Sequence, residues 1–175
     1  MNDIAIRPAR PEDVRPAFAL ALRVFMVYSG QIYKRKAIRH FRKTCRDREA
    51  IRAYKTGQAP MFIAWDGEKR VGMAAASWRR EGKISDLFVD PAYHRRGIAT
   101  GLMDTLIAAM GAPKITLGSS VHGLPFYLRY GFVPTDVEQH KHGAIWTPMA
   151  FTPSPPAGGA PPRGSQGNSS LRGLR

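Results

Sequence analysis

The stretch LFVDPAYHRRGIATGLMDTLIAAM, residues 87–110, joins an apolar, strand-like run to an amphipathic helix through a basic turn that contains glycine. A helix N-terminus carries about half a positive charge and several N–H groups without an intrahelical partner. Gly97 and Ala99 let a ligand approach that backbone closely, and Arg95 and Arg96 add fixed positive charge. The turn is therefore predicted to bind an anion, with phosphate or pyrophosphate as the expected guest.

Two common phosphate-binding motifs do not fit this turn. A P-loop requires Gly-Lys-Ser or Gly-Lys-Thr, and the chain contains neither triplet. A dinucleotide-binding fingerprint requires a second glycine where Ala99 stands, followed by an acidic residue about 20 positions later. The segment KITLGSS, residues 114–120, supplies no such acid. The sequence therefore disfavours both motifs.

The pattern on either side of the turn predicts one mixed α/β domain over residues 1–151, with a mostly antiparallel sheet flanked by helices and one parallel step. Asp13 is expected to cap the first helix, which places Pro16 in the first turn, where no N–H is needed. Asp66-Gly67 is expected to close a hairpin. Strands are predicted at residues 3–7, 61–65, 71–78, 83–89, 114–118, 132–137 and 143–151, and helices within 10–28, 32–56, 97–110 and 123–130.

Positive charge is unevenly distributed along a chain whose formal net charge is +14. The Pro-, Gly- and Ser-rich segment 152–175 is predicted to be a disordered basic tail. Residues 34–55 form a second basic segment, opposed only by Asp47 and Glu49. That segment is either a solvated helix face or an electrostatic guide for an acidic substrate or a nucleic acid.

Several classes of protein are disfavoured. No uncharged apolar run reaches the length of about 18 residues that a membrane span needs, and Asp3 argues against a secretory signal. The single cysteine, Cys45, excludes an internal disulfide framework, fits a reducing cytoplasm, and is expected to pack in the core. His140 and His142 are too sparse for a metal site. The oligomeric state stays open, a homodimer included.

Two segments together resemble the GNAT superfamily of N-acetyltransferases. HRRGIA, residues 94–99, is similar to the acyl-CoA signature Gln/Arg-x-x-Gly-x-Gly/Ala, with His94 as a departure at the first position. ITLGSSVHGLPFYLRYGFVPT, residues 115–135, resembles the family's ending, in which a strand and Ser/Asn precede Pro-Phe-Tyr-x-x-x-Gly-Phe. EQHKHGAIWTPM, residues 138–149, further resembles the closing strands of a bacterial subgroup with few assigned substrates.

This resemblance implies transfer of an acetyl group from acetyl-CoA to a primary amine of a small molecule or a protein, without a metal. Backbone groups of the strand at Leu87, Phe88 and Val89 would bind the pantetheine arm. The residues expected around the pyrophosphate are His94, Arg95, Arg96, Gly97, Ile98, Ala99 and Thr100.

The resemblance also assigns candidate catalytic roles. Tyr127 would protonate the leaving thiolate, or else it is a core tyrosine, and Ser120 would orient pantetheine or a water, or else it caps a helix. The general base is harder to assign because Lys83, a cation, stands where the family often has glutamate. Asp86, acting through water, and His122 are the candidates, although Asp86 could instead pair with an arginine.

The acceptor amine is left open by the sequence. Its pocket is expected from the first two helices and the last strands. An alternative reading of the basic segment 34–55 is a nucleic-acid-associated protein on the same scaffold, either an RNA-binding module or an aminoacyl-tRNA acetyltransferase.

Overall fold

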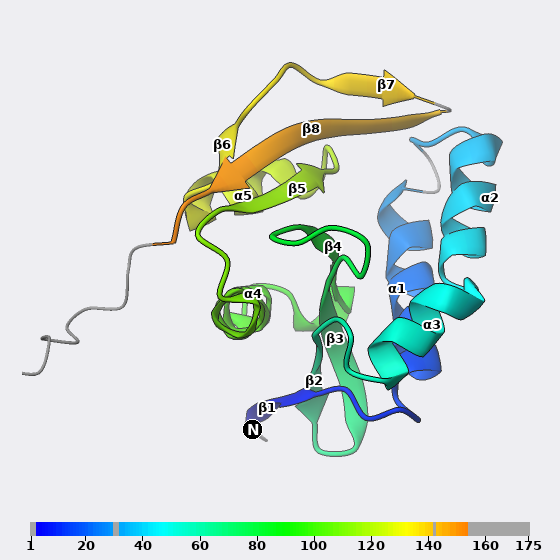
Figure 1. Cartoon of the computed structure of the whole chain (residues 1–175). Helices are drawn as coiled ribbons and strands as arrows, with labels where there is room; N and C mark the ends of the chain where they lie inside the picture. The colour runs from blue at the N-terminus through cyan, green and yellow to red at the C-terminus, as the bar shows by residue number, and fades with distance from the viewer. Residues whose placement is uncertain (1–2, 30–31, 142, 154–175) are drawn as a thin grey trace, which may run out of the picture.

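The computed structural model describes residues 3–29, 32–141 and 143–153, and its strands form two antiparallel groups. The first group has the order β1 (Ile4–Pro8), β2 (Met61–Asp66), β3 (Lys69–Ala76) and β4 (Ile84–Val89). In the second, β8 (Ala144–Phe151) lies between β5 (Ile115–Ser119) and β6 (Val133–Pro134), and it also pairs with β7 (Gln139–Lys141). Figure 1 shows the second group above the first.

Helices cover both faces of the first group of strands (Figure 1). On one face lie α1 (Val14–Ser29), α2 (Arg35–Thr44) and α3 (Arg48–Lys55), and on the other lies α4 (Ile98–Met110). Strand β3 is buried on both faces, with Met73 in the core under α1 and α3 and Ala74 in the core under α4. The last helix, α5 (Leu124–Tyr130), lies beside β5 and β8, and its apolar side chains pack against the core under α4.

The two groups of strands meet at one point. Among the described residues, a single parallel bridge links Lys83, just before β4, to Thr116 of β5. Beyond this bridge β4 and β5 do not pair with each other. This bridge is the parallel step that the sequence predicted, and the mixed, mostly antiparallel fold is confirmed. The register of β3 and β4 also shifts: Ala75 faces Asp86 while Ala76 faces Ile84, so Ser85 is an extra residue, a β-bulge.

The hairpin predicted at Asp66-Gly67 is confirmed, because Asp66 pairs with Lys69 across the turn and Gly67 has a φ of 57°. Pro16 lies in the first turn of α1, as expected. Asp13 directly precedes that helix, but its carboxylate accepts a hydrogen bond from the Arg10 amide and forms an ion pair with Arg70. Its backbone carbonyl accepts from the Ala17 amide, as at the start of a helix, but among the described residues no helix amide donates to its carboxylate, so the expected side-chain cap is not found.

The helix predicted over 32–56 is in fact two helices. Asp47 is extended, and its carboxylate accepts hydrogen bonds from the amides of Glu49 and Ala50, which starts α3 anew. Cys45 is buried at the break, as expected, whereas Ile32, which helical spacing would place on the inward face, precedes α2 and is 41% exposed. The predicted strand 132–137 is also wrong in extent, because only Val133–Pro134 pair and β7 follows as a separate strand.

The predicted domain boundary at residue 151 coincides with the end of β8 at Phe151. The prediction of a disordered tail concerns residues that, from 154 onward, lie outside the described part of the chain. Within the described ranges, no helix combines the length and apolar character that a bilayer crossing demands.

Candidate active site

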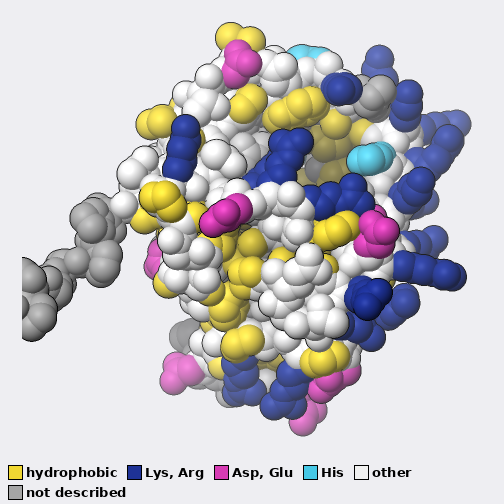
Figure 2. Space-filling model, in the orientation of Figure 1, with side chains coloured by type: hydrophobic (Ala, Val, Ile, Leu, Met, Phe, Trp, Pro, Cys, Tyr) yellow, Lys and Arg dark blue, Asp and Glu magenta, His cyan; other side chains and the backbone are white. Residues whose placement is uncertain are grey.

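The divergence of β4 from β5 opens a cavity of about 1100 Å³ between α1, β4, α4, α5 and β8. Figure 2 shows hydrophobic side chains in a recess of the surface, with Lys and Arg side chains around it. The cavity brings together all the residues that the sequence singled out for the site except Arg96, namely Asp86, Leu87, Phe88, Val89, His94, Arg95, Gly97, Ile98, Ala99, Thr100, Ser120 and Tyr127.

The backbone of the turn before α4 offers unpaired donors. Arg95 and Gly97 both have positive φ, 60° and 76°, and α4 has no side-chain cap at its N-terminus. Within the described residues, no amide from 95 to 100 donates a hydrogen bond to a protein acceptor; the first to do so is Gly101, to the carbonyl of Gly97. A Cβ placed on Gly97 would meet nothing within 4 Å, so the space beside this glycine is open. The arrangement suits a bound anion.

His94 is held by the protein on both ring nitrogens. Nε2 lies 2.9 Å from the carbonyl oxygen of Val89, and Nδ1 lies 3.4 Å from the hydroxyl of Tyr28, whose ring stacks on the imidazole. Since a carbonyl only accepts, Nε2 carries the proton and Nδ1 accepts from Tyr28. His94 therefore links the turn to α1 and to β4, and its ring N–H is already bonded to the Val89 carbonyl oxygen.

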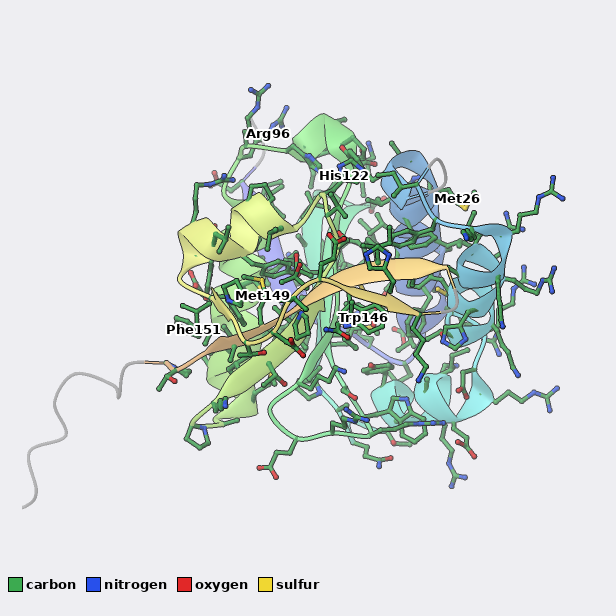
Figure 3. The ribbon with its side chains drawn as sticks, turned by 90° about the horizontal axis from the view of Figure 1, so that it is seen from above. Met26, Arg96, His122, Trp146, Met149 and Phe151 are labelled. Carbon is green, nitrogen blue, oxygen red and sulfur yellow. The ribbon has the colours of Figure 1, made fainter. Side chains whose placement is uncertain are left out.

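The two arginines of the turn differ in position. Arg95 lines the cavity, whereas the guanidinium of Arg96 lies over the ring of Tyr93 at 5.0 Å and is absent from the lining. Figure 3 places Arg96 at the outer edge of the molecule. Arg95 is thus the cation of the turn that faces the cavity.

Asp86 is the buried carboxylate of the cavity, 8% exposed. Burial raises the pKa of its carboxyl to about 6, so the group is still mostly ionised at pH 7. The described structure gives it no arginine or lysine partner within ion-pair distance. Lys83, which the sequence analysis rejected as a base because it is a cation, lies at the bridge to β5 and lines a separate, smaller pocket of about 260 Å³.

Tyr127 combines the two readings that the sequence left open. Its ring packs edge-on against Phe126 and Phe132, at centroid distances of 5.2 and 5.6 Å, and it also lines the cavity. Burial, and secondarily the charge of Asp86, raise the pKa of its phenol above the ordinary value. The hydroxyl is therefore protonated throughout the neutral range and can only act as a proton donor there.

The two remaining polar candidates lie on the loop before α5. The Oγ of Ser120 accepts a hydrogen bond of 3.1 Å from the amide of Gly123 and so holds the turn before α5, whereas the N-terminus of α5 itself has no side-chain cap. His122 also lines the cavity, with its ring 5.5 Å from that of Tyr28.

Sequence reasoning did not identify an aromatic wall in the cavity. Phe25, Tyr33, Phe41, Phe88 and Trp146 all line it, from α1, α2 and its preceding loop, β4 and β8. Helical spacing marked Phe25 and Phe41 only as inward-facing. No local signal indicates that α2 lies against β8, because the contact joins residues far apart in sequence.

Among the residues that the structure describes, no group of three or more His, Cys, Asp or Glu side chains could hold a metal ion. His140 bonds instead to Glu138, with Nε2 2.8 Å from Oε1. His142, the other histidine considered in the sequence, lies outside the described residues.

Comparisons with known proteins agree with this geometry. The acetyltransferase (GNAT) domain family matches residues 30–153. The chain is 31% identical over 146 residues to the uncharacterized N-acetyltransferase YafP of Escherichia coli (strain K12), an alignment that covers 83% of this chain and 92% of the relative.

Two solved structures share the fold. The PaiA N-acetyltransferase of Thermoplasma acidophilum in complex with coenzyme A matches with a TM-score of 0.71 and 17% identity, covering 86% of this chain and 99% of that one. YncA of Salmonella typhimurium, an acetyltransferase solved with its cofactor acetyl-CoA, matches with a TM-score of 0.63 and 16% identity, covering 89% and 99%.

Proposed function

The chain belongs to the GNAT family of acetyltransferases and is an acyl-CoA-dependent N-acetyltransferase; from that premise we propose that it transfers the acetyl group of acetyl-CoA to a primary amine of a small molecule or a protein. The observation that carries the proposal is the run of unpaired amides from residue 95 to residue 100 at the edge of the cavity. Asp86 and Tyr127 line the same cavity.

The described residues suit two parts of the cofactor, its pyrophosphate and its pantetheine arm. The amides of 95–100 and the guanidinium of Arg95 would hold the pyrophosphate, because an anion is stabilised both by N–H donors and by the helix dipole. The edge of β4 that faces away from β3 has no partner strand at Leu87–Val89, and of its outward-facing groups the Val89 carbonyl oxygen is already bonded to His94 Nε2. These groups would bind the amide-rich pantetheine arm as an added strand does.

Acetyl-CoA supplies a thioester, whose C–S bond breaks as the bond between the amine nitrogen and the acetyl carbon forms. Asp86 would accept the proton that the amine loses, directly or through a water, because a carboxylate with a pKa of about 6 is ionised yet basic enough to act near neutral pH. Tyr127 would give its phenolic proton to the departing sulfur. His122 is the second candidate for the base.

Thermal unfolding with and without acetyl-CoA tests the proposal. A ligand at about 100 times its Kd stabilises the folded state by about 2.7 kcal/mol, so millimolar acetyl-CoA should raise the Tm clearly. Gly97→Glu should abolish this rise by placing a carboxylate before the amides. Gly57→Glu is the matched control, because Gly57 also has positive φ and nothing within 4 Å but lies away from the cavity. No rise in Tm for the unsubstituted protein would contradict the proposal.

A second candidate function rests on the basic segment. Every Lys and Arg side chain of this segment is exposed, and none has a carboxylate partner among the described residues. Asp47 and Glu49 instead face Arg79, at 3.8 and 3.3 Å. The cations are Lys34, Arg35, Lys36, Arg39, Arg42, Lys43, Arg46, Arg48, Arg52 and Lys55.

Such a face would bind RNA through phosphates, either alone or to bring an aminoacyl-tRNA to the cavity. Binding would then weaken steeply with salt, with a slope of log K against log salt of about −0.7 for each phosphate on a single strand. Electrophoretic mobility shifts with tRNA between 50 and 300 mM salt measure it. Absent or salt-insensitive binding would remove this candidate.

A further inference from the structure

The cavity has a second end, formed by α1, the start of α2, β4 and β8, where aromatic side chains gather. The ring centroids of Tyr33 and Phe25 are 5.7 Å apart, those of Phe25 and Phe41 are 4.2 Å apart, and those of Phe41 and Phe88 are 5.6 Å apart. Trp146 of β8 lines the cavity as well, and Figure 3 shows it on that strand near the middle of the molecule. We call this set of five side chains the aromatic wall.

Two hydrogen bonds between segments distant in the sequence hold the aromatic wall in place. The hydroxyl of Tyr33 donates a hydrogen bond of 2.7 Å to the carbonyl oxygen of Ile145, and the amide of Lys34 donates to the carbonyl of Gly143 at 3.2 Å. These bonds join the start of α2 to β8 and hold both sides of this end of the cavity. The wall is therefore positioned before a ligand arrives, which lowers the entropic cost of binding.

Charge is scarce at this end. Of the lining residues contributed by α1, α2, β4 and β8, Asp86 alone is ionised at neutral pH. The other charged lining residues, Arg95, Asp104 and Arg129, belong to the turn, to α4 and to α5. An acceptor carboxylate or phosphate placed against the aromatic wall would thus lose its water without gaining a cation, which is costly.

Asp86 and the aromatic faces suit a different group. A single ammonium is attracted both by a carboxylate and by aromatic faces within about 6 Å. The flat apolar body that carries it would bury its surface against the rings. A second ammonium on the acceptor would have no carboxylate partner among the residues that line this end of the cavity.

We propose that the acceptor is an aralkylamine-like monoamine, whose one amino group faces Asp86 and whose aromatic body packs on the aromatic wall. This inference rests on the proposed function and assigns its substrate class. The transfer is the one described above: an N–C bond forms, the C–S bond breaks, and the proton leaves the amine nitrogen towards Asp86.

The test measures release of the CoA thiol by the full-length chain with matched amines. Phenethylamine is the probe, n-butylamine lacks the ring, 1,4-diaminobutane adds a second ammonium, and phenylalanine adds a carboxylate to the same skeleton. Because burial of a phenyl ring contributes to binding, kcat/KM for phenethylamine should exceed that of each of the other three by roughly 10- to 100-fold. Equal or better turnover of the diamine or of phenylalanine would overturn the inference.

A pair of variants tests the wall itself. Phe41→Leu removes one face of the wall, and it should raise KM for phenethylamine by about 3- to 10-fold while the Kd for acetyl-CoA stays unchanged. Phe62→Leu is the matched control, since Phe62 is also half-buried but does not line the cavity. An equal KM change in both variants would contradict a specific role of the wall.

The two proposals fail in distinguishable ways. Acetyl-CoA that stabilises the protein while phenethylamine is not turned over would overturn the assigned substrate class and leave the acetyl-CoA site standing. Loss of acetyl-CoA stabilisation in the unsubstituted protein would overturn the proposed function itself. Calorimetric titration of phenethylamine into the CoA-saturated protein adds a readout that needs no turnover, and absence of binding there would overturn the substrate class.

Discussion

The amide of Thr116 donates a hydrogen bond of 2.7 Å to the carbonyl oxygen of Gly82, at the single point where the two groups of strands meet. Gly82 has a φ of +64°, and a Cβ at this position would lie 2.6 Å from the carbonyl oxygen of Lys114. The chain thus approaches β5 closely here and diverges from it immediately afterwards. The width of the cavity depends on this junction.

Gly82→Ala should therefore destabilise the fold more than a change of φ alone would. The left-handed conformation costs a non-glycine residue about 1 kcal/mol, and the clash with the Lys114 carbonyl adds to it, for a total of roughly 2–4 kcal/mol. Gly57→Ala isolates the first part, because Gly57 has a φ of +73° and open space around it. Urea unfolding of both variants gives the comparison, and equal losses would show that the junction is not tight.

Asp86→Asn should stabilise the protein at neutral pH. Burial raises the folded-state pKa of Asp86 from 3.8 to about 6, so between these values the folded chain holds a proton that the unfolded chain has released. The free energy of unfolding must therefore fall as pH rises through this window. Above pH 6 the ionised carboxylate costs about 2–3 kcal/mol, which the asparagine removes.

Urea unfolding at pH 4, 5, 6, 7 and 8 measures this effect. The variant should exceed the parent in stability at pH 8 and match it near pH 4, while acetyl transfer is lost by about 100-fold or more if Asp86 is the base. A stability difference that does not depend on pH would contradict the raised pKa. Retained activity would transfer the role to His122.

Tyr127→Phe should lower kcat by about 100-fold with the Kd for acetyl-CoA unchanged, because the change removes one hydroxyl and keeps the ring packing. The raised pKa of Tyr127 adds a second expectation: no activity loss from its ionisation should appear below about pH 10. Pre-steady-state thiol release with both proteins provides the measurement. Unchanged kcat would leave Tyr127 with a packing role only.

Ser120→Ala should lower the free energy of unfolding by about 1 kcal/mol, the usual cost of losing one side-chain hydrogen bond to the backbone. Ser120→Thr keeps the hydroxyl and should lose less. Thermal and urea unfolding give the stability, and kcat is measured well below the Tm of both variants. A fall in kcat for the alanine variant at temperatures where it is fully folded would show that Ser120 also acts in acetyl transfer, beyond holding the turn before α5.

Local sequence was sufficient wherever the chemistry is local. The Asp66-Gly67 hairpin follows from the positive φ that glycine permits, and the start of α4 follows from the Gly97 turn. Burial of β3 on both faces follows from its unbroken apolar run, VGMAAA, residues 71–76. The apolar spacing continues across Asp47 and so gives no sign of a break. The break follows from the Asp47 carboxylate, which caps the N-terminus of α3.

Local sequence patterns did not predict the contacts that side chains make with elements distant in the chain. His94 was expected beside the pyrophosphate, but the bonds of its ring to Val89 and Tyr28 arise only because α1 packs beside β4. Arg95 and Arg96 are adjacent in sequence, yet one faces the cavity and the other lies over Tyr93. A positive φ at Arg95 separates their directions, and no sequence rule marks that residue for it.

By itself, the sequence determined the order of the elements and the anion-binding turn, since both depend on periodicity and on glycine within a few residues. The tertiary structure alone decided the shape of the cavity. Its gap exists because β4 and β5 share one bridge among the described residues and then diverge, and its aromatic wall exists because Tyr33, in the loop before α2, is bonded to β8 more than a hundred residues away. Contacts between distant segments leave no periodic trace in either segment, so only the folded chain reveals them.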